Sequence, residues 1–303
     1  MSTSYRLSIC IPVYNTLVDS FINELALQAN RATAPVELVV LDDHSEPNFA
    51  QSNQSLDSVC RYVYLPENIG RSRIRNLFLE YTTGEYLLFI DGDSAIIDPD
   101  FIQKYLDFLD QCSPEVVVGA SIYQSEKPDR EHLLRWKYSR ERESKNANER
   151  SKLTGSFKTN NFIIKRSIFS LIKFNDALIG YGHEDTLFGL DLERNKIKID
   201  HIENPVLNRH LDSNHLFLIK TENAIRNLSW LYKHPNYSNQ IQAIKLIQAF
   251  SKLQKWGLVR VFLMLFWFSA PVCFWTLKKG YVHLKIFDFY KLGLFIRKIR
   301  TEI

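Results

Sequence analysis

The first 93 residues of the chain alternate short, mostly apolar segments with segments of helical periodicity, and a polar cluster follows each apolar segment. The apolar segments cover residues 7–13, 36–41, 61–65 and 85–90, and helices are expected over residues 16–30 and from 68–70 to about 81. Short apolar segments suit strands buried on both faces of a parallel sheet, and repeated strand–helix units favour a right-handed, doubly wound arrangement. The pattern predicts an α/β fold with a mostly parallel central sheet flanked by helices.

The region that follows continues the alternation less regularly. A helix is expected over residues 99–109, and strands are expected over 115–121, 160–165 and 196–202. Residues 127–152 are highly charged and weakly periodic, which is typical of a solvated helix, with a mobile lid as the alternative.

The polar clusters come at the ends of the first four predicted strands. They are Pro12–Asn15, Asp42–Asp43, the segment that begins at Asn68, and Asp91–Asp93. Because the carboxyl ends of parallel strands meet at one edge of a sheet, where ligands bind in the crevice between loops, we expect these clusters to lie together. An aromatic ring or backbone there can face a nucleotide base, and carboxylates can accept hydrogen bonds from base and ribose.

The acidic pair Asp91-Gly-Asp93 directly follows the predicted strand 85–90. Two carboxylates held close together repel unless a cation lies between them, and magnesium-like ions are commonly held by one or two carboxylates plus substrate phosphates. A metal–diphosphate site is the first hypothesis. A polar turn is the alternative, because Asp and Gly are ordinary turn residues. A calcium loop of the EF-hand type is excluded, because Ala95 and Ile102 stand where it needs oxygen ligands.

Five ordered motifs carry a family resemblance. They are Ile11-Pro-Val-Tyr-Asn15, Leu41-Asp-Asp-His-Ser45, Asn68-Ile-Gly-Arg-Ser-Arg-Ile-Arg-Asn76, Asp91-Gly-Asp93 and Gly182-His-Glu-Asp185. In order and approximate spacing, over about residues 5–215, they resemble family 2 glycosyltransferases, which are enzymes of the GT-A fold. One such acidic pair alone is weak evidence, whereas five ordered motifs make a chance match improbable.

The resemblance implies a set of residues that bind a nucleotide-sugar donor. Within this set, the loop after the first strand and Asp43 cradle the base, the Arg-Asn pair lies beside the nucleotide, and Asp91 lies near the ribose. The donor-binding residues expected from the resemblance are Pro12, Val13, Tyr14, Asn15, Asp43, Asn68, Gly70, Arg75, Asn76, Asp91 and Gly92.

The resemblance also implies a divalent cation, Mn²⁺ or Mg²⁺, and a general base. Asp93 matches the acid that ligates the metal bridging the donor diphosphate, and Asp185 matches the base that deprotonates the acceptor hydroxyl. Such a metal stabilises the charge on the leaving nucleoside diphosphate. A carboxylate within hydrogen-bond reach takes the proton of the hydroxyl as the new bond forms. Attack opposite the leaving group inverts the anomeric carbon.

Beside this base, Glu184 and Gly182 are expected to contact acceptor or donor hydroxyls. The alternative for Glu184 and Asp185 is an acidic pair at a helix N-terminus, which the helix dipole favours. Gly180 and Gly182 argue for the sugar site, because glycine lets the backbone approach a ligand closely.

A second metal ligand is expected after the last predicted strand. In related chains, a metal-binding histidine stands at the position that Asn208 occupies here. His210 lies two residues further on, and in an extended backbone it would share that face. We assign His210 as the second ligand, because neutral imidazole is a common one, with a surface histidine as the alternative. Which of the two residues reaches the metal stays open.

The cysteines and the N-terminus bear on the compartment. Cys10, Cys60, Cys112 and Cys273 lie far apart and form no metal-type spacing, which favours a reduced, cytoplasmic setting. The N-terminus lacks the basic start and continuous apolar segment of a secretory signal, so its apolar residues are expected to form a strand. Nucleic acid is not an expected partner, and a homodimer is left open.

The C-terminal region differs from the rest. We expect a catalytic domain over residues 1–215 and a helical extension over 216–303. From Ser251 onward there are ten Lys or Arg against two acidic residues, so the first 250 residues carry −4 of the net charge of +4. Residues 261–277 are uncharged, but the segment contains Pro271 and falls short of the about 20 residues that a spanning helix needs.

Cations flank this uncharged segment on both sides, against the positive-inside bias of a single span. We therefore expect the tail to lie on or dip into the cytoplasmic leaflet of the membrane, attracted by anionic lipids. Packing on the catalytic domain or in a dimer interface is the alternative.

The function expected from these features is that of a metal-dependent inverting glycosyltransferase, peripheral on the inner face of the cell membrane. It would move a sugar from a nucleotide sugar, expected to be a UDP-sugar, to a glycan or lipid-linked acceptor in surface polysaccharide synthesis. One alternative is a phosphotransferase or phosphatase with Asp91 as nucleophile, although such enzymes usually carry the motif on the first strand, followed by Thr or Val rather than Ser94. Another is a non-catalytic carbohydrate- or lipid-binding module.

Overall fold

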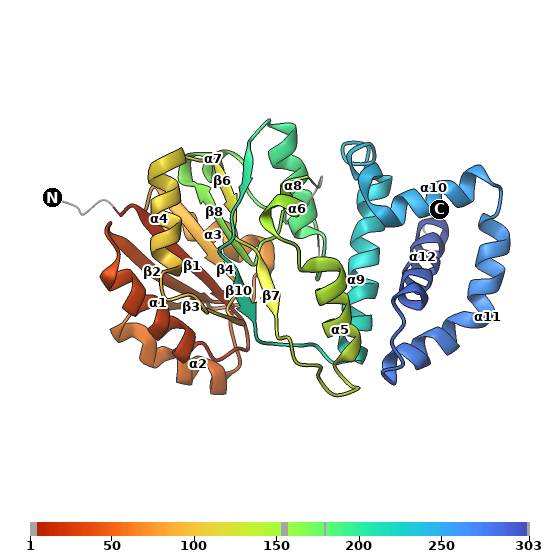
Figure 1. The fold of residues 1–303 in the computed structure, drawn as a ribbon, viewed down its shortest axis with the longest axis horizontal. Coiled ribbons are helices and arrows are strands. Elements are labelled where there is room, and N and C mark those ends of the chain that lie inside the picture. The colour runs from red at the N-terminus through yellow and green to blue at the C-terminus, as the bar shows by residue number, and fades with distance from the viewer. Residues whose placement is uncertain (1–4, 153–156, 179, 302–303) are drawn as a thin grey trace. The chain divides into compact units, whose positions relative to one another are not determined.

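The computed structural model describes residues 5–152, 157–178 and 180–301, and the chain forms two compact units (Figure 1). The sheet unit comprises residues 1–124, 144–177 and 184–210. The helical unit comprises residues 125–143, 178–183 and 211–303.

A seven-stranded sheet forms the centre of the sheet unit. Its strands are β1 (Leu7–Val13), β2 (Val36–Asp42), β3 (Arg61–Tyr64), β4 (Tyr86–Ile90), β6 (Val116–Val118), β8 (Asn161–Lys165) and β9 (Ile199–His201), in the spatial order β3-β2-β1-β4-β8-β6-β9. The first four strands in this order are parallel, as the sequence predicted. Strand β8 runs antiparallel to both β4 and β6, so the sheet is mixed beyond β4.

A second, three-stranded sheet lies beside the acidic pair. Its strands are β5 (Ser94–Ala95), β7 (Ser121–Tyr123) and β10 (Val206–Asn208), in the order β5-β10-β7. The strand expected over residues 115–121 divides between the two sheets, because Ala120 takes a left-handed backbone conformation with φ 75°. The chain therefore leaves the large sheet after β6 and enters the small one with β7.

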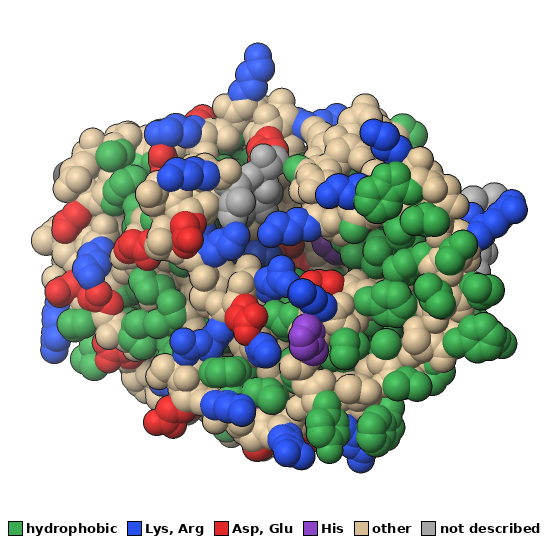
Figure 2. All heavy atoms as spheres, turned by 45° about the vertical axis from the view of Figure 1, so that its right-hand side comes forward, with side chains coloured by type: hydrophobic (Ala, Val, Ile, Leu, Met, Phe, Trp, Pro, Cys, Tyr) green, Lys and Arg blue, Asp and Glu red, His purple; other side chains and the backbone are tan. Residues whose placement is uncertain are grey.

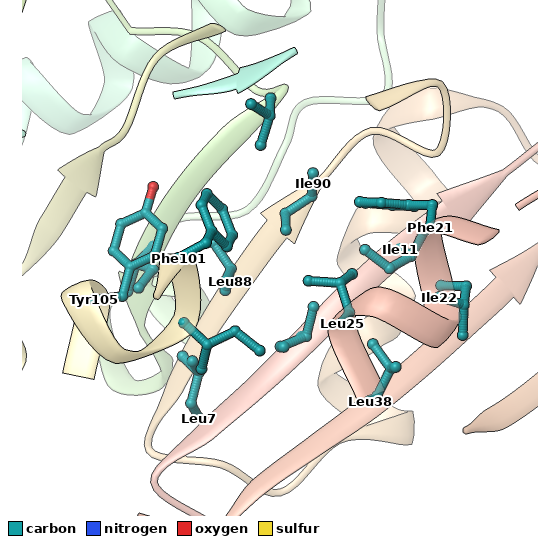
Figure 3. Packing of buried hydrophobic residues seen from close by; sticks show 14 of the residues in the cluster. Leu7, Ile11, Phe21, Ile22, Leu25, Leu38, Leu88, Ile90, Phe101 and Tyr105 are labelled. Carbon is teal, nitrogen blue, oxygen red and sulfur yellow. The ribbon is translucent and has the colours of Figure 1, made fainter. Parts of the chain in front are cut away.

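Helices cover both faces of the large sheet. They are α1 (Asp19–Arg31), α2 (Pro47–Gln54), the 3₁₀ turn η1 (Ser55–Ser58), α3 (Arg71–Tyr81), α4 (Phe101–Cys112), α6 (Ala147–Ser151), α7 (Arg166–Leu171) and α8 (Glu184–Arg194). Alternate side chains of β4 point to opposite faces, and all five of its residues are buried. Leu88 joins a cluster with α1 and α4, shown in Figure 3, while Phe89 joins a cluster with α3, α7 and α8.

The helical unit contains the rest of the chain's helices among the described residues. They are α5 (Leu133–Tyr138), the π-helical turn η2 (Ser139–Glu143), α9 (Asn214–Lys233), the 3₁₀ turn η3 (Gln240–Ala243), α10 (Lys245–Lys255), α11 (Val259–Lys278) and α12 (Leu284–Thr301). The charged segment 127–152 contributes α5 and η2 here and α6 to the sheet unit, and Leu134 and Arg150 within it are buried. It is therefore not a single solvated helix.

Candidate functional site

The loop after β1 is tied to the loop after β2. Asn15, with φ 49°, donates its backbone N–H to Ser45 Oγ at 2.8 Å and accepts from the N–H of Glu46 through Oδ1 at 2.8 Å. The Val13 carbonyl accepts from the N–H of Asp43 at 2.7 Å. The Val13 side chain is buried, so it offers the site only its backbone, whereas the Tyr14 ring is 54% exposed.

The two neighbouring acids Asp42 and Asp43 have different surroundings. Asp42 is fully buried and accepts hydrogen bonds from the N–H of Ser45 and from the Tyr62 hydroxyl, each at 2.7 Å. Asp42 thus stabilises the turn, and its carboxylate is not accessible to a ligand.

Asp43 accepts from the backbone N–H groups of Ile69 and Gly70 at 2.7 and 3.0 Å, and its carbonyl accepts from Asn68 Nδ2 at 3.0 Å. Burial raises the pKa of the Asp43 carboxyl, and the two backbone N–H groups partly offset this rise. The clasp joins the end of β2 to the start of α3, so Asp43, Asn68 and Gly70 lie together as predicted.

Arg75 of α3 pairs with the first acid of the Asp91-Gly-Asp93 motif. Its Nη2 donates to Asp91 Oδ1 at 2.6 Å, and the Arg75 side chain is only 2% exposed. Its guanidinium also lies 5.7 Å from the centre of the Phe174 ring. Gly92 follows Asp91, where a Cβ would lie 3.3 Å from the Pro12 carbonyl oxygen, so the motif packs tightly on the loop after β1.

The side chain of Asn76 has structural partners. Its Nδ2 donates to the Phe174 carbonyl and its Oδ1 accepts from the Phe174 N–H, both at 2.9 Å. The amide therefore holds the segment around Phe174 against α3, and a donor contact of Asn76 stays a prediction.

The second acid, Asp93, has an unusual electrostatic environment. Burial, and after it the neighbouring Asp91 carboxylate, raises the pKa of Asp93 to about 6, while the charges of Arg71 and His210 act in the opposite direction. Arg71 and His210 come from distant parts of the sequence, and both lie near enough to the Asp93 carboxylate to affect its pKa. A carboxylate that is buried beside another anion is a position that a cation stabilises.

The segment after the last strands reaches the acidic pair through the small sheet. Asn208 of β10 pairs with Ser94 of β5, and the Arg209 N–H donates to the Asp93 carbonyl at 3.1 Å. The extended backbone expected through residue 210 ends at Asn208, because the His210 N–H turns back to donate to Asn208 Oδ1 at 3.2 Å. His210 still lies near Asp93, although not by strand alternation.

The Glu184–Asp185 pair occupies the first turn of α8. Asp185 Oδ2 accepts from Lys158 Nζ at 2.8 Å, and its Oδ1 accepts from the N–H of Thr186 at 2.7 Å. Glu184 is 10% exposed and lies 3.5 Å from Arg71 Nη1. Arg71 therefore contacts Glu184, and its charge also acts on Asp93.

Gly182 belongs to the helical unit, where it packs on α9. A Cβ at Gly182 would lie 2.6 Å from Ala224 Cβ, and its carbonyl accepts from Asn227 Nδ2 at 2.8 Å. Close packing therefore accounts for this glycine without a sugar, and an acceptor contact of Gly182 stays a prediction.

Arg71 and Lys158 are the site residues that sequence reasoning missed. Arg71 was within a quoted motif, and its place as the first residue of α3, at the edge where the strands end, is a signal that could have identified it. Lys158 follows no motif, so only the folded chain brings it to Asp185.

The described residues offer few side-chain ligands in one place for a metal ion. None of their His, Cys, Asp and Glu side chains gather in groups of three or more that could hold an ion. Asp93 and His210 therefore fit only an ion that takes its other ligands from substrate phosphates and water, which is common for Mg²⁺.

Comparison with known proteins settles the family. The family model described as glycosyl transferase family 2 matches residues 8–172, more than half of the chain. The chain belongs to glycosyltransferase family 2. It is therefore an enzyme that transfers sugars, and the phosphotransferase and non-catalytic alternatives are set aside.

The family membership agrees with individual relatives. An uncharacterized glycosyltransferase of Haemophilus influenzae is 26% identical over 190 residues, which are 61% of this chain and 70% of that relative. The minor teichoic acid biosynthesis protein GgaB of Bacillus subtilis is 28% identical over 153 residues, 46% of this chain but only 16% of GgaB.

Solved structures of other glycosyl-transferring proteins show the same fold. The mannosyltransferase PcManGT from Pyrobaculum calidifontis, in complex with GDP-Man and Mn²⁺, has a TM-score of 0.61 at 14% identity, covering 100% of this chain and 89% of that one. S. aureus TarS in complex with UDP-GlcNAc has a TM-score of 0.52 at 16% identity, covering 98% and 90%. The predicted GT-A fold is thus confirmed.

Proposed function

We propose that this family 2 enzyme is a metal-dependent inverting glycosyltransferase that uses a UDP-sugar. The acceptor would be a hydroxyl of a glycan or of a lipid-linked glycan in surface polysaccharide assembly. The observation that carries the proposal is the position of Arg71, whose guanidinium lies 3.5 Å from Glu184 and whose charge also acts on Asp93. Arg71 thereby supports a single site for donor diphosphate and acceptor hydroxyl.

The donor would bind across the ends of β1, β2 and β4. The loop Pro12–Asn15, with the exposed Tyr14 ring, would face the base, and Asp43 would accept from it. Arg71 supplies a guanidinium group that suits phosphate oxygens, and Arg75 holds the Asp91 carboxylate, which would lie near the ribose. PcManGT in complex with GDP-Man and TarS in complex with UDP-GlcNAc support a nucleotide sugar, although they differ in the base.

A divalent cation, Mn²⁺ or Mg²⁺, would be held by Asp93, with His210 or Asn208 beside it. When bound, it would neutralise charge on the diphosphate as the sugar leaves. The residues fit such an ion, because burial and Asp91 penalise the charged form of Asp93. PcManGT and the glucosyl-3-phosphoglycerate synthase of Mycobacterium tuberculosis, both in complex with Mn²⁺, support this assignment.

Asp185 would act as the general base. Thr186 N–H and Lys158 Nζ orient its carboxylate, and an acceptor hydroxyl beside Lys158 would donate to the second lone pair of Oδ2. Glu184 and Gly182 would contact sugar hydroxyls. Proton transfer to a carboxylate during attack opposite the leaving group produces inversion without a covalent enzyme intermediate.

The relatives support the place of the reaction in the cell. GgaB and the putative teichuronic acid biosynthesis glycosyltransferase TuaG, both of Bacillus subtilis, carry names from cell-envelope polysaccharide synthesis. We propose a cytoplasmic enzyme, peripheral on the inner membrane face, with a catalytic region over residues 1–215 and an extension over 216–303. The anionic membrane surface would be a partner of that extension. Formation of a homodimer stays an open prediction.

The test is a panel of UDP- and GDP-sugars with the full-length protein. Thermal unfolding with and without Mn²⁺ would identify the nucleotide, and mass spectrometry of an envelope glycan extract would detect transfer. We expect stabilisation by a UDP-sugar that needs Mn²⁺ and is lost in Asp93→Asn. Equal stabilisation after removal of all divalent ions would show that the proposed metal dependence is wrong. A preference for a GDP-sugar would show that the proposed UDP-sugar donor is wrong.

A further inference from the structure

Helix α11 presents an apolar surface to solvent along one side. The exposed fractions are 49% for Val261, 56% for Met264, 56% for Leu265, 73% for Trp267, 67% for Phe268, 63% for Val272 and 56% for Trp275. Most of these residues are three or four positions apart, which places them on one helix face. In Figure 2, hydrophobic side chains gather over the right-hand part of the surface, where the C-terminal helices lie.

The opposite side of α11 packs against α12. Phe262 and Phe266 contact Phe289 with ring centres 4.9 and 5.9 Å apart. A Cβ at Gly293 would come within 2.1 Å of the Phe266 ring, so the α12 backbone lies directly on that ring. The helix therefore has one packed side and one apolar side that the described residues of the helical unit leave exposed.

By length and composition, α11 is the helix among the described residues that could cross a membrane, and only 11% of its most apolar window is buried. Its partner α12 argues against a span. Five Lys or Arg and one Asp are distributed along α12, and Asp288 pairs with Arg142 at 3.1 Å and with Lys291 at 3.3 Å. These charges are costly in hydrocarbon, so α11 would have to leave α12 to span.

The charges around the apolar face indicate what covers it. Lys252, Lys255 and Arg260 precede the face, and Lys278 and Lys279 follow it. A second copy of the chain would bring the same positive charges together, which is unfavourable. An anionic lipid surface matches both the apolar face and its cationic ends.

A cavity lies at the N-terminal end of this face, within the helical unit. Its volume is about 910 Å³, and Lys233, Arg260 and Arg300 contribute the cations of its lining. Phe250, Val259 and Ile299 contribute apolar walls, and no carboxylate is among the described residues that line it. Such a lining suits a phosphate group that is joined to an apolar chain.

We infer that α11 binds the bilayer as a helix parallel to the membrane plane, and that the adjoining cavity receives the phosphate of an anionic phospholipid. The exposed face of α11 lies at the boundary between headgroups and acyl chains, while α12 stays on the aqueous side. This arrangement decides among spanning, dipping and lying on the membrane, and it does not depend on the catalytic proposal.

The first test removes the apolar contact. The full-length Trp267→Glu/Phe268→Glu variant should bind vesicles of phosphatidylcholine and phosphatidylglycerol at least about tenfold more weakly, because two exposed aromatic groups can no longer be buried in lipid. The matched control is Leu27→Glu/Leu171→Glu, which adds the same charges at residues that are 53% and 82% exposed in the sheet unit. Equal losses in both variants would overturn the α11 assignment. Thermal unfolding verifies that each variant is folded.

The second test concerns the cavity. Arg260→Gln/Arg300→Gln should weaken binding to vesicles that contain phosphatidylglycerol by about fivefold for each cation, and leave binding to pure phosphatidylcholine unchanged. The control Arg31→Gln/Lys173→Gln removes two exposed cations from the sheet unit. If inorganic phosphate stabilises the wild type but not the cavity variant, while vesicle binding is unaffected, the ligand is soluble phosphate and the lipid assignment is wrong.

The third test separates lying on the membrane from spanning it. Membrane-bound protein should be released by alkaline carbonate, and lipids brominated near the headgroup should quench Trp267 and Trp275 to a similar extent. Resistance to carbonate, with one tryptophan quenched only by lipids brominated deep in the acyl chains, would establish a span. Concentration-dependent dimers that Trp267→Glu/Phe268→Glu abolishes, without vesicle binding, would assign the face to a second copy. Both outcomes overturn the inference, and neither readout requires sugar transfer.

Discussion

The sheet unit and the helical unit use long apolar segments in opposite ways. All five residues of β4 are buried between helices on the two faces of the sheet. The polar residues Asp91 and Asp93 follow at the end of the strand. α11 is equally apolar, but most of its side chains on one face are exposed. An apolar segment is therefore not always covered by its own chain. The helices of the sheet unit bury β4, whereas the exposed face of α11 is available to bind something outside the chain.

The charges of the two units differ in the same manner. In the sheet unit, Arg75 and Asp91 meet in a mostly buried pair, and Lys158 and Arg71 contact the carboxylates of Asp185 and Glu184. The cations at the ends of α11 are on the surface and share a sign. The proposed sugar transfer in the sheet unit should therefore be sensitive to the position of single side-chain atoms. The proposed membrane binding of the helical unit should instead depend on the exposed apolar area and on the net charge.

The largest effect is expected for the proposed base. Asp185→Asn should lower the rate of transfer by about 10³-fold, because general base catalysis contributes about 10² to 10⁴. The measurement is transfer to the acceptor, with donor-dependent thermal stabilisation as the control for binding. Asp107→Asn is the matched exposed substitution and should have no effect. Transfer by Asp185→Asn at the wild-type rate would remove Asp185 from the mechanism.

The buried ion pair should dominate the stability of the sheet unit. Arg75→Met leaves the Asp91 carboxylate uncompensated and should lower the free energy of unfolding by about 2–3 kcal/mol, less than for a fully buried pair because Asp91 is 26% exposed. Arg73→Met, on the same helix, breaks a pair whose side chains are 61% and 60% exposed and should cost under about 1 kcal/mol. Chemical denaturation of both variants measures this contrast, and equal losses would contradict it.

The helical unit should be sensitive to shape where the sheet unit is sensitive to charge. Gly293→Ala places a methyl group on the Phe266 ring and should lower the free energy of unfolding by about 1–3 kcal/mol, which is typical of overpacking. In Gly293→Ala/Phe266→Leu the smaller side chain makes room, so the combined loss should be smaller than the sum of the single losses. Additive losses would show that the contact is not tight.

Lys158 variants test whether a single charge orients the proposed base Asp185. Lys158→Met should reduce kcat by about tenfold, because a misplaced reacting group loses much of the rate that correct orientation provides. Lys158→Arg keeps a cation beside Asp185 and should retain most of the rate. If the Met and Arg variants are equally slow, Lys158 acts by its precise shape rather than by its charge.

The smallest effect concerns the stability of the metal-free protein against pH. The pKa of Asp93 is raised to about 6, so the folded state disfavours its ionised form, and stability falls as pH rises from about 4 to about 6 and stays lower above that. Asp93→Asn should therefore unfold about 2–4 °C higher than the wild type at pH 8, for a gain of about 1 kcal/mol. The difference should vanish near pH 4. A destabilised variant at pH 8 would contradict the assigned environment.

The fold was largely predictable, because the strand pattern is a local property. Leu7–Val13 was predicted to the residue, and the ends of β2 and β4 within one residue. The direction of β8 was not predictable, since an apolar segment reads the same when it runs parallel or antiparallel to β4. The division of residues 115–121 between two sheets depends on the left-handed backbone at Ala120, and Gly119 before it is the one local sign of a break.

The site was predictable in composition but not in the partners of each residue. The sequence does not indicate that Asp42 and Asp43 have different partners. Asp42 accepts a hydrogen bond from the Tyr62 hydroxyl, and Asp43 accepts from the backbone N–H groups of Ile69 and Gly70. Those partners come from strands and loops that are distant in sequence. The exposed side of α11 could likewise not be identified, because its other side is defined only by contacts with α12, α9 and α10 in the folded chain.

The clasp at Asp43 has a consequence for ligand recognition. Its carboxylate holds the two N–H groups directly before α3, the helix that begins with Arg71 and carries Arg75 four residues later. A base that binds Asp43 must share these oxygens with the peptide that anchors both guanidinium groups. If the donor binds as proposed, recognition of the base and binding of the phosphates are coupled through the start of α3, so nucleotide analogues altered only in the base should also change how the phosphates are bound.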